Sequence, residues 1–300
     1  MSRGPASTSA SASGWRLGLL AVPYALGLVV LVALPLAATV GLAFTEYDLV
    51  RPARWVGLDN LVALGDDEVF WISIRNSLVY ALVAVPLRLL GALGLALLLH
   101  RRRRGVGAER TVSFLPTVLP DAAYALVWVW LLNPLYGPIN LALGALGLPT
   151  PAWTTDPDAA MAGIIAMSLL QVGEGFLICL AIRQQLPDEL YQVAAVEGAG
   201  PWQVLRRVTL PMMAPALVLL ALRDTLFAFQ ATFVPALLVT GGGPPPHATT
   251  FLPLYVYRTG FEYLRYGYAS AATLAMFVVT AVVVALQWRL VRRWRRSLAY

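Results

Sequence analysis

Ser168, Gln171 and Glu174 recur at every third position within an otherwise apolar stretch of the chain. On a helix, this spacing places the three side chains along one stripe. A hydroxyl, an amide and a carboxylate can hydrogen-bond a polyhydroxylated molecule, and a carboxylate makes stronger hydrogen bonds than a neutral acceptor. We therefore expect this stripe to face a polar solute.

Arg88, Arg223 and Asp224 are further ionisable residues inside apolar stretches. Such groups cost about 2.5–3.5 kcal/mol in hydrocarbon, so they face protein or a water-filled path. Either arginine could pair with Glu174 or Asp224 to hold helices together, or the carboxylates could bind solute. As sequence neighbours, Arg223 and Asp224 point about 100° apart and are not expected to pair with each other.

Arg223 has one more alternative, because it lies near the start of its apolar stretch and could extend toward the membrane surface. An arginine in a solute path would favour an anionic solute, whereas unpaired carboxylates would favour a neutral sugar. The spacing of the residues does not decide between these two solutes.

Several kinds of chemistry are excluded by the sequence. The chain has no lysine, so it cannot form the Gly-rich phosphate loop that ends in Lys and Ser or Thr. His100 and His247 are isolated, so we expect no metal site. Cys179, the single cysteine, is expected to pack. With no nucleophile beside a base in any span, we expect no catalytic residue, no cofactor and no enzymatic activity.

The composition is that of a membrane protein, with 59% hydrophobic and 13% charged residues among 300. A hydrophobic helix of about 20 residues crosses a bilayer. Six segments reach that length, which predicts an all-α integral membrane protein with six transmembrane helices: 17–44, 76–99, 112–132, 159–182, 212–239 and 269–290. The first segment is longer than the apolar core of a signal peptide, and we expect it to be a span.

The arginines predict the orientation, because short positively charged loops stay in the cytoplasm. They cluster before the first span, in alternate connections and after the last span, whereas residues 46–71 hold six carboxylates and two arginines. Residues 133–158 hold carboxylates and no arginine. Both termini are therefore expected in the cytoplasm. Because the arginines punctuate hydrophobic runs instead of gathering on one face with aromatics, we expect no nucleic-acid binding.

Residues 183–211 form the longest predicted cytoplasmic connection, and they have the pattern of two short helices. Pro187 and two acidic residues predict a helix start, and that helix is expected to reach Val196. Gly198 permits a sharp reversal. Pro201 opens a second helix, which Pro211 is expected to end before the next span.

Residues 191–211 read Tyr-Gln-Val-Ala-Ala-Val-Glu-Gly-Ala-Gly-Pro-Trp-Gln-Val-Leu-Arg-Arg-Val-Thr-Leu-Pro. This segment resembles the EAA loop of ABC importer permeases, which reads Glu-Ala-Ala, then Asp-Gly-Ala, then a hydrophobic and basic helix ending in Leu-Pro. Gln192 replaces the first Glu, Glu197 replaces Asp and Leu205 replaces Phe. The resemblance implies that the loop docks on a partner ATPase through Gln192, Ala195, Glu197, Gly198, Ala199, Leu205 and Pro211.

Further landmarks extend the resemblance over most of the chain: Val56-Gly57-Leu58-Asp59-Asn60-Leu61, Phe70-Trp71 with Asn76-Ser77, Tyr136-Gly137, Thr240-Gly-Gly-Gly-Pro244 and Gly267-Tyr-Ala-Ser-Ala271. They are similar to the binding-protein-dependent carbohydrate-uptake family, which includes maltose and glycerol-3-phosphate permeases. The resemblance implies solute contacts at Gln171, Glu174, Asp224 and Phe227, in addition to Ser168 from the stripe.

The same resemblance implies a bacterial inner-membrane, multi-pass subunit of an ATP-driven importer for a sugar, a polyol or a sugar phosphate. Its expected partners are a second homologous permease, two ATP-binding subunits and an extracytoplasmic solute-binding protein. The expected organisation is a disordered cytoplasmic tail at 1–14, a permease domain at 15–291 and a basic cytoplasmic tail at 292–300. The alternative function is an ATP-independent secondary transporter, which should show repeated halves and interrupted helices.

Overall fold

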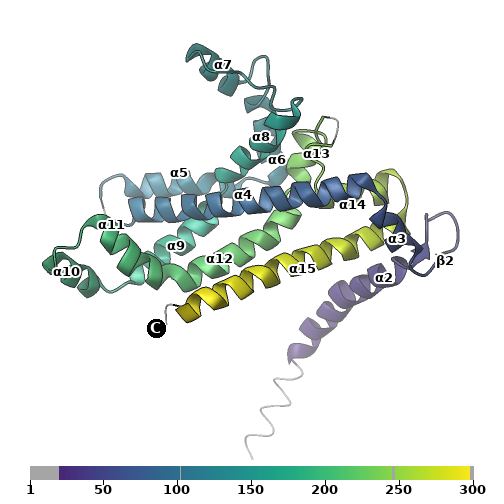
Figure 1. The fold of residues 1–300 in the computed structure, drawn as a ribbon, viewed down its shortest axis with the longest axis horizontal. Coiled ribbons are helices and arrows are strands. Elements are labelled where there is room, and N and C mark those ends of the chain that lie inside the picture. The colour runs from purple at the N-terminus through teal and green to yellow at the C-terminus, as the bar shows by residue number, and fades with distance from the viewer. Residues whose placement is uncertain (1–19, 102, 245–246, 298–300) are drawn as a thin grey trace, which may run out of the picture. The chain divides into compact units, whose positions relative to one another are not determined.

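The computed structural model describes residues 20–101, 103–244 and 247–297, and side chains as far as residue 292. The expected tail at 1–14 and the last residues of the basic tail lie outside this part. The described chain is mainly helical (Figure 1). One two-stranded antiparallel sheet, β1 (Thr45–Glu46) with β2 (Arg54–Trp55), departs from the all-α prediction.

Among the described residues, four helices are long and apolar enough to cross a membrane: Leu20–Leu42, Glu68–Leu99, Pro201–Leu238 and Tyr266–Arg292. Two further spans arise if each of two bent helix pairs counts as one: Val106–Val118 with Asp121–Leu131, and Pro157–Leu169 with Gly173–Gln185. Every one of the six predicted segments therefore corresponds to a long helix or a bent pair.

The predicted spans 112–132 and 159–182 are each broken into two helices, so the prediction of one continuous helix in each is wrong. α5 (Val106–Val118) and α6 (Asp121–Leu131) meet at 101°. Pro120 is the N-cap of α6, and the residue before a proline avoids the helical conformation, which ends α5. α8 (Pro157–Leu169) and α9 (Gly173–Gln185) meet at a gentler 43°.

The long helix α4 (Glu68–Leu99) begins eight residues before the predicted start at 76. Its N-cap, Asp67, explains the difference, because the carboxylate accepts a hydrogen bond from the backbone N–H of Phe70 at 3.1 Å. A capped first turn lets the helix begin at Glu68, ahead of the charged Arg75 that lies just before the predicted start.

Contacts divide the chain into two units. Unit 1 holds residues up to Asp66 and the segment Thr259–Leu274. Its elements include the π-helical turn η1 (Val29–Ala33), α2 (Leu34–Leu42), the small sheet and α3 (Asp59–Gly65). The Asn60 side chain donates to the backbone carbonyls of Ala43 and Thr45, both at 2.9 Å, and so ties α3 to the end of α2.

Unit 2 holds the rest of the described chain. Its remaining elements are α7 (Pro138–Ala145), α10 (Asp188–Val196), α11 (Pro201–Val204), η2 (Leu205–Thr209), α12 (Leu210–Ala231), α13 (Phe233–Leu238) and α14 (Leu252–Tyr257). The turn η3 (Arg258–Glu262) and the helix α15 (Tyr266–Ser297) cross the boundary between the units. α15 therefore stays helical past residue 292, where the basic tail was expected to begin.

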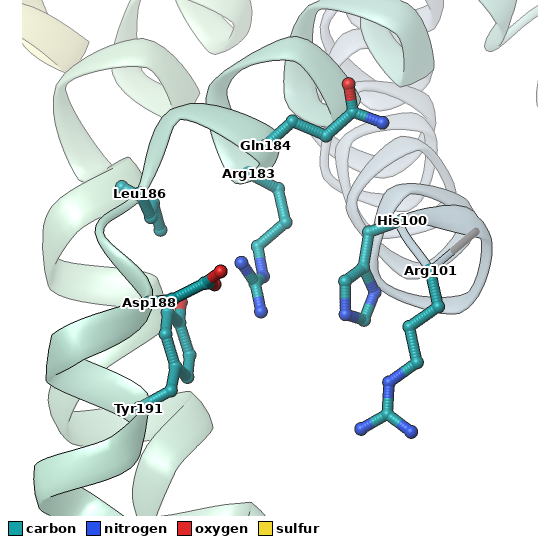
Figure 2. A pocket seen from close by; sticks show the side chains of 7 residues that line it. All are labelled: His100, Arg101, Arg183, Gln184, Leu186, Asp188 and Tyr191. Carbon is teal, nitrogen blue, oxygen red and sulfur yellow. The ribbon is translucent and has the colours of Figure 1, made fainter.

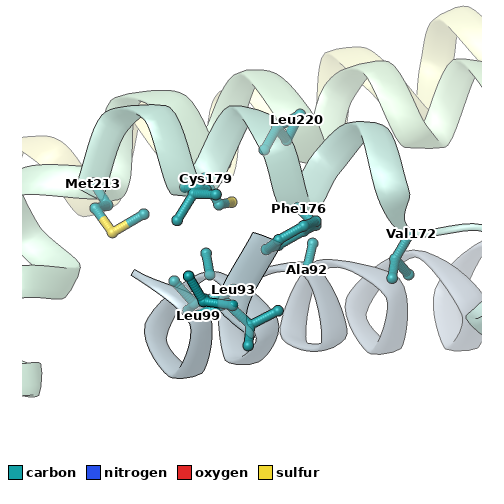
Figure 3. Close-up of a cluster of buried hydrophobic side chains, with 11 residues drawn as sticks. Ala92, Leu93, Leu99, Val172, Phe176, Cys179, Met213 and Leu220 are labelled. Carbon is teal, nitrogen blue, oxygen red and sulfur yellow. The ribbon is translucent and has the colours of Figure 1, made fainter. Parts of the chain in front are cut away.

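The core of unit 2 is packed between α4, α9 and α12 (Figure 3). Phe176, Cys179 and Met213 are fully buried in it. Cys179 thus packs among apolar side chains, as predicted. This core holds three helices together around the polar residues described next.

Candidate functional site

Arg88 and Asp224 form an ion pair between α4 and α12. The Arg88 Nε and Asp224 Oδ2 atoms are 3.9 Å apart, and the side chains are only 18% and 10% exposed. A buried carboxylate and a buried guanidinium stabilise each other, because either charge would cost several kcal/mol if it were buried without the other. Of the two roles considered for the intramembrane charges, an ion pair that holds helices together is therefore the one that Arg88 and Asp224 have.

The break between α8 and α9 positions the next contact. The predicted stripe requires a continuous helix through Gln171, and this prediction is wrong: the helix ends at Leu169 and resumes at Gly173. The backbone carbonyl of Gln171 instead accepts a hydrogen bond of 3.2 Å from Arg88 Nη2. Ser168 is buried, and its hydroxyl donates to the Ile165 carbonyl at 2.7 Å.

Glu174, Arg223 and Phe227 form a more open group. Arg223 on α12 pairs with Glu174 in the first turn of α9. The guanidinium of Arg223 also lies 4.9 Å from the centre of the Phe227 ring. The Glu174 side chain is 52% exposed and Phe227 is 45% exposed, so this group, unlike Arg88 and Asp224, is open to a ligand or a partner.

Arg223 pairs with Glu174, as in the alternative that holds helices together, and it lies about 20 Å along α12 from Leu210, at 1.5 Å per residue. The expectation that Arg223 and Asp224 do not pair is wrong, because the Arg223 Nη1 atom lies 3.8 Å from the Asp224 Oδ1 atom. The long arginine side chain bends back and spans the 100° between the two backbone directions.

These contacts join four charges from three helices into one network with two guanidinium groups and two carboxylates. The structure thus brings Gln171, Glu174, Asp224 and Phe227 together around the two arginines. Ser168 is not part of this network, because its hydroxyl donates to the Ile165 carbonyl of its own helix, α8. The sequence does not predict that Arg88 binds the helix break. Arg88 binds the backbone carbonyl of Gln171, and that carbonyl lacks a helical partner only because α8 ends at Leu169.

The second candidate site is the segment 192–211, which folds as predicted into a helix, a turn and a helix. α10 starts after Pro187 and ends at Val196. Gly198 adopts φ +72°, and the Ala199 N–H donates to the Ala194 carbonyl at 2.9 Å. This pattern is the glycine-dependent helix stop in which a left-handed residue closes the last turn.

The expected stop at Pro211 is wrong. α11 continues through the π-helical turn η2 into α12, and Pro211 lies in the first turn of α12. A proline costs little where the helical hydrogen-bond pattern already changes, because the N–H that it lacks has no regular partner there. The region Pro201–Leu238 is therefore one long helical segment.

Exposed apolar side chains mark the surface of this loop. Val196 is 89% exposed, Trp202 68% and Val193 56%. These three residues are not among the predicted loop contacts, although apolar residues on short helices flanked by polar residues were the available signal. Gln192, Ala195, Glu197 and Gly198 are exposed on the same segment. Such a patch is typical of a protein interface.

Two contacts fix the loop to the helices behind it. The Tyr191 hydroxyl lies 3.1 Å from the Thr209 hydroxyl and so joins α10 to η2. The guanidinium of Arg183, in the last turn of α9, lies 4.2 Å from the centre of the Tyr191 ring. These contacts attach α10 to the end of α9 and to the helical turn that continues into α12.

Residues 89–296 match the family described as "Binding-protein-dependent transport system inner membrane component". This match covers more than half of the chain. The protein belongs to this family. Two relatives are each 32% identical over 91% of this chain and 89% of their own length: a probable ABC transporter permease protein, YesP, of Bacillus subtilis, and the sulfoquinovosyl glycerol transport system permease protein SmoG of Agrobacterium fabrum.

A solved structure agrees with this membership. The chain matches a permease chain of a bacterial ABC transporter involved in the import of the acidic polysaccharide alginate, with a TM-score of 0.80 and 25% identity. The match covers 93% of this chain and 96% of that chain. The predicted relation to carbohydrate-uptake permeases is confirmed, and the chain is a multi-pass membrane component of an importer.

The matched region contains the helix break, α12 and the whole loop 192–211. Membership in the family therefore applies to the part of the chain that carries both candidate sites. Arg88 lies one residue before the matched region.

Proposed function

We propose that this chain is the permease subunit of an ABC importer in which a separate ATPase docks on residues 192–211. A second permease and an extracytoplasmic solute-binding protein complete the assembly. The loop offers exposed Val193, Val196 and Trp202 to the ATPase, beside the loop positions implied by the resemblance, among them Gln192 and Glu197.

The observation that carries this proposal is that α11, η2, α12 and α13 follow one another as a single long helical segment, Pro201–Leu238. It begins in the docking loop and carries Arg223 and Asp224 in its middle. A rigid rotation of the loop, driven by closure of the ATPase, would displace one side of the ion-pair network relative to α4 and α9. Such movement of packed helices is a known way to alternate between inward-facing and outward-facing states.

The solute is proposed to be a carbohydrate or a related polyhydroxylated molecule. Glu174 and Phe227 are half-exposed, so a hydroxyl-binding carboxylate and an aromatic surface lie near each other on this unit. Solute contact by Gln171 and Asp224 is proposed to be secondary, since Asp224 is held by Arg88. Relatives whose names specify sulfoquinovosyl glycerol and alginate support this class of solute.

Gly198 provides the test of the docking loop. A Cβ at this position meets no atom of this chain within 4 Å, so within this chain the effect of a substitution comes from the φ of +72°. We expect Gly198→Val to reduce both solute uptake and solute-stimulated ATP hydrolysis in the assembled transporter, since left-handed backbone costs about 1–2 kcal/mol for such a residue. Gly198→Asn should keep most activity, because asparagine tolerates this conformation.

Gly200→Ala is the matched control. Gly200 also has open space around it, but its φ is −70°, which alanine adopts readily, so the Gly200→Ala transporter should take up solute normally. Full uptake by Gly198→Val, or an equal loss in Gly200→Ala, would contradict the proposed coupling role. Uptake by this chain without any ATPase would favour the secondary transporter instead.

A further inference from the structure

A cavity of about 610 Å³ lies where α4 and α9 end and α10 begins, apart from the ion-pair network. Seven residues line it: His100, Arg101, Arg183, Gln184, Leu186, Asp188 and Tyr191. In Figure 2, His100 and Arg101 lie on one side, Asp188 and Tyr191 lie on the other, and Arg183 extends between them. None of them is a proposed solute contact or an exposed docking residue, although Arg183 and Tyr191 fix the loop behind that surface.

The positive charge of this cavity is not balanced. Two guanidinium groups face one carboxylate, and within the described part of the chain neither Arg101 nor Arg183 forms an ion pair. Arg183 is held through the face of its guanidinium, which lies over the Tyr191 ring. A stacked guanidinium keeps its N–H edge available for an anion.

His100 adds a third group to the same wall. Its Nδ1 lies 2.6 Å from the Leu97 carbonyl and therefore carries the hydrogen, so Nε2 of the neutral ring is free to accept a hydrogen bond from a ligand. Burial lowers the pKa of His100, and the nearby charges of Arg183, Arg101 and Arg110 lower it further. The cavity thus has a positive potential that a bound anion would relieve.

We propose that this cavity binds the phosphate group of a phosphate monoester or diester through Arg101 and Arg183, while His100 Nε2 accepts a hydrogen bond from a hydroxyl of the ligand or of a singly protonated phosphate. A phosphate presents several oxygens in different directions, which suits donors that come from separate segments, and guanidinium groups bind it in a bidentate way. The volume exceeds that of phosphate alone and leaves room for an organic remainder. A soluble phosphorylated metabolite and a phospholipid headgroup both carry this chemistry.

A bound phosphate would connect the end of α4 to the junction of α9 and α10. That junction holds the base of the docking loop, because Arg183 contacts Tyr191 of α10. Occupancy would therefore restrain the loop against α4 and regulate transport from the side opposite to solute entry. This binding site exists whether or not the proposed solute class is correct.

The test uses the assembled transporter in two settings. In lipid-free detergent, binding of inorganic phosphate is measured by calorimetry. In nanodiscs of phosphatidylglycerol, native mass spectrometry counts the lipids retained by the complex. Each setting compares the unmodified complex with Arg101→Gln, Asp188→Asn and the control Arg104→Gln, which removes the same charge from the same connection without lining the cavity.

For a soluble ligand, we expect Arg101→Gln to weaken phosphate binding about tenfold, as for loss of one charged hydrogen bond. Asp188→Asn should tighten it, since a repelling carboxylate is lost, and Arg104→Gln should leave it unchanged. For a lipid ligand, Arg101→Gln should lose one retained phosphatidylglycerol that Arg104→Gln keeps. Absence of both effects, or equal effects of Arg101→Gln and Arg104→Gln, would overturn the proposal.

Discussion

At the scale of single residues, burial separates the two intramembrane ion pairs. Arg88 and Asp224 are nearly enclosed, whereas Glu174 is half-exposed and Arg223 is one-third exposed. The enclosed pair stabilises the packing of α4 on α12. The open pair can exchange its partners for a solute or for another subunit at a smaller cost, because an exposed charge stays partly solvated.

We therefore predict that Asp224→Asn destabilises the protein far more than Glu174→Gln. Removing the Asp224 charge leaves the Arg88 guanidinium buried without its counter-ion, which costs about 3–5 kcal/mol. Loss of the Glu174 charge should cost about 1 kcal/mol or less. Thermal unfolding of the purified complex in detergent, followed by tryptophan fluorescence, measures both.

The double substitution of Arg88→Met and Asp224→Leu is the control for this prediction. Two apolar side chains of similar size remove both charges together, so most of the lost stability should return. A double variant that is as unstable as Asp224→Asn would show that the pair does not act as a unit.

At the scale of secondary-structure elements, the break between α8 and α9 depends on close packing against α5. Gly173 is the first residue of α9, and a Cβ there would meet the hydroxyl of Thr117 and lie 3.0 Å from Phe114 Cα. The absence of a side chain lets α9 start directly against α5. The break in turn presents the Gln171 carbonyl to Arg88.

Gly173→Ala is therefore expected to destabilise the protein by about 1–3 kcal/mol, the usual cost of inserting a methyl group into a packed site. The matched variant Gly94→Ala adds the same methyl group to α4 where no atom lies within 4 Å. It should be neutral or slightly stabilising, since alanine favours helix. Unfolding temperatures that fall equally in both variants would refute the packing explanation.

At the scale of the whole molecule, the first long helix is apolar and uncovered by the rest of the described chain. The helix Leu20–Leu42 has a mean hydropathy of 2.4, and no part of its most apolar window is buried inside this chain. Lipid or another subunit must cover such a surface. The arginine-rich connections and the docking loop are then expected on the cytoplasmic side.

This orientation predicts the behaviour of fused reporters. Alkaline phosphatase inserted within residues 46–71 or 133–158 should be active, because it works only outside the cytoplasm. Green fluorescent protein fused after Tyr300 should fluoresce, since it folds in the cytoplasm. Active phosphatase inserted at residues 101–104 would mean that the arginine distribution does not set the orientation.

Particular residues show why the sequence predicts some of these features and not others. The turn at Gly198 and the start of α10 after Pro187 are local, because glycine and proline restrict the backbone wherever they occur. Pro211 is also a local signal for a helix end, but the helix continues through it because the π-helical turn η2 comes directly before it. The expected stripe through Gln171 failed because the break after Leu169 depends on how Gly173 packs against α5, which is a contact between distant parts of the chain.

The sequence by itself determined the apolar segments, the turn within residues 192–211 and the family, since each depends on composition or on contiguous residues. The tertiary structure alone decided which charges meet. Arg88, Glu174 and Asp224 lie on three helices, and their partners depend on how α4, α9 and α12 pack. The same holds for the phosphate-type cavity, because His100 and Arg183 are 83 residues apart in the chain and meet only at the helix ends.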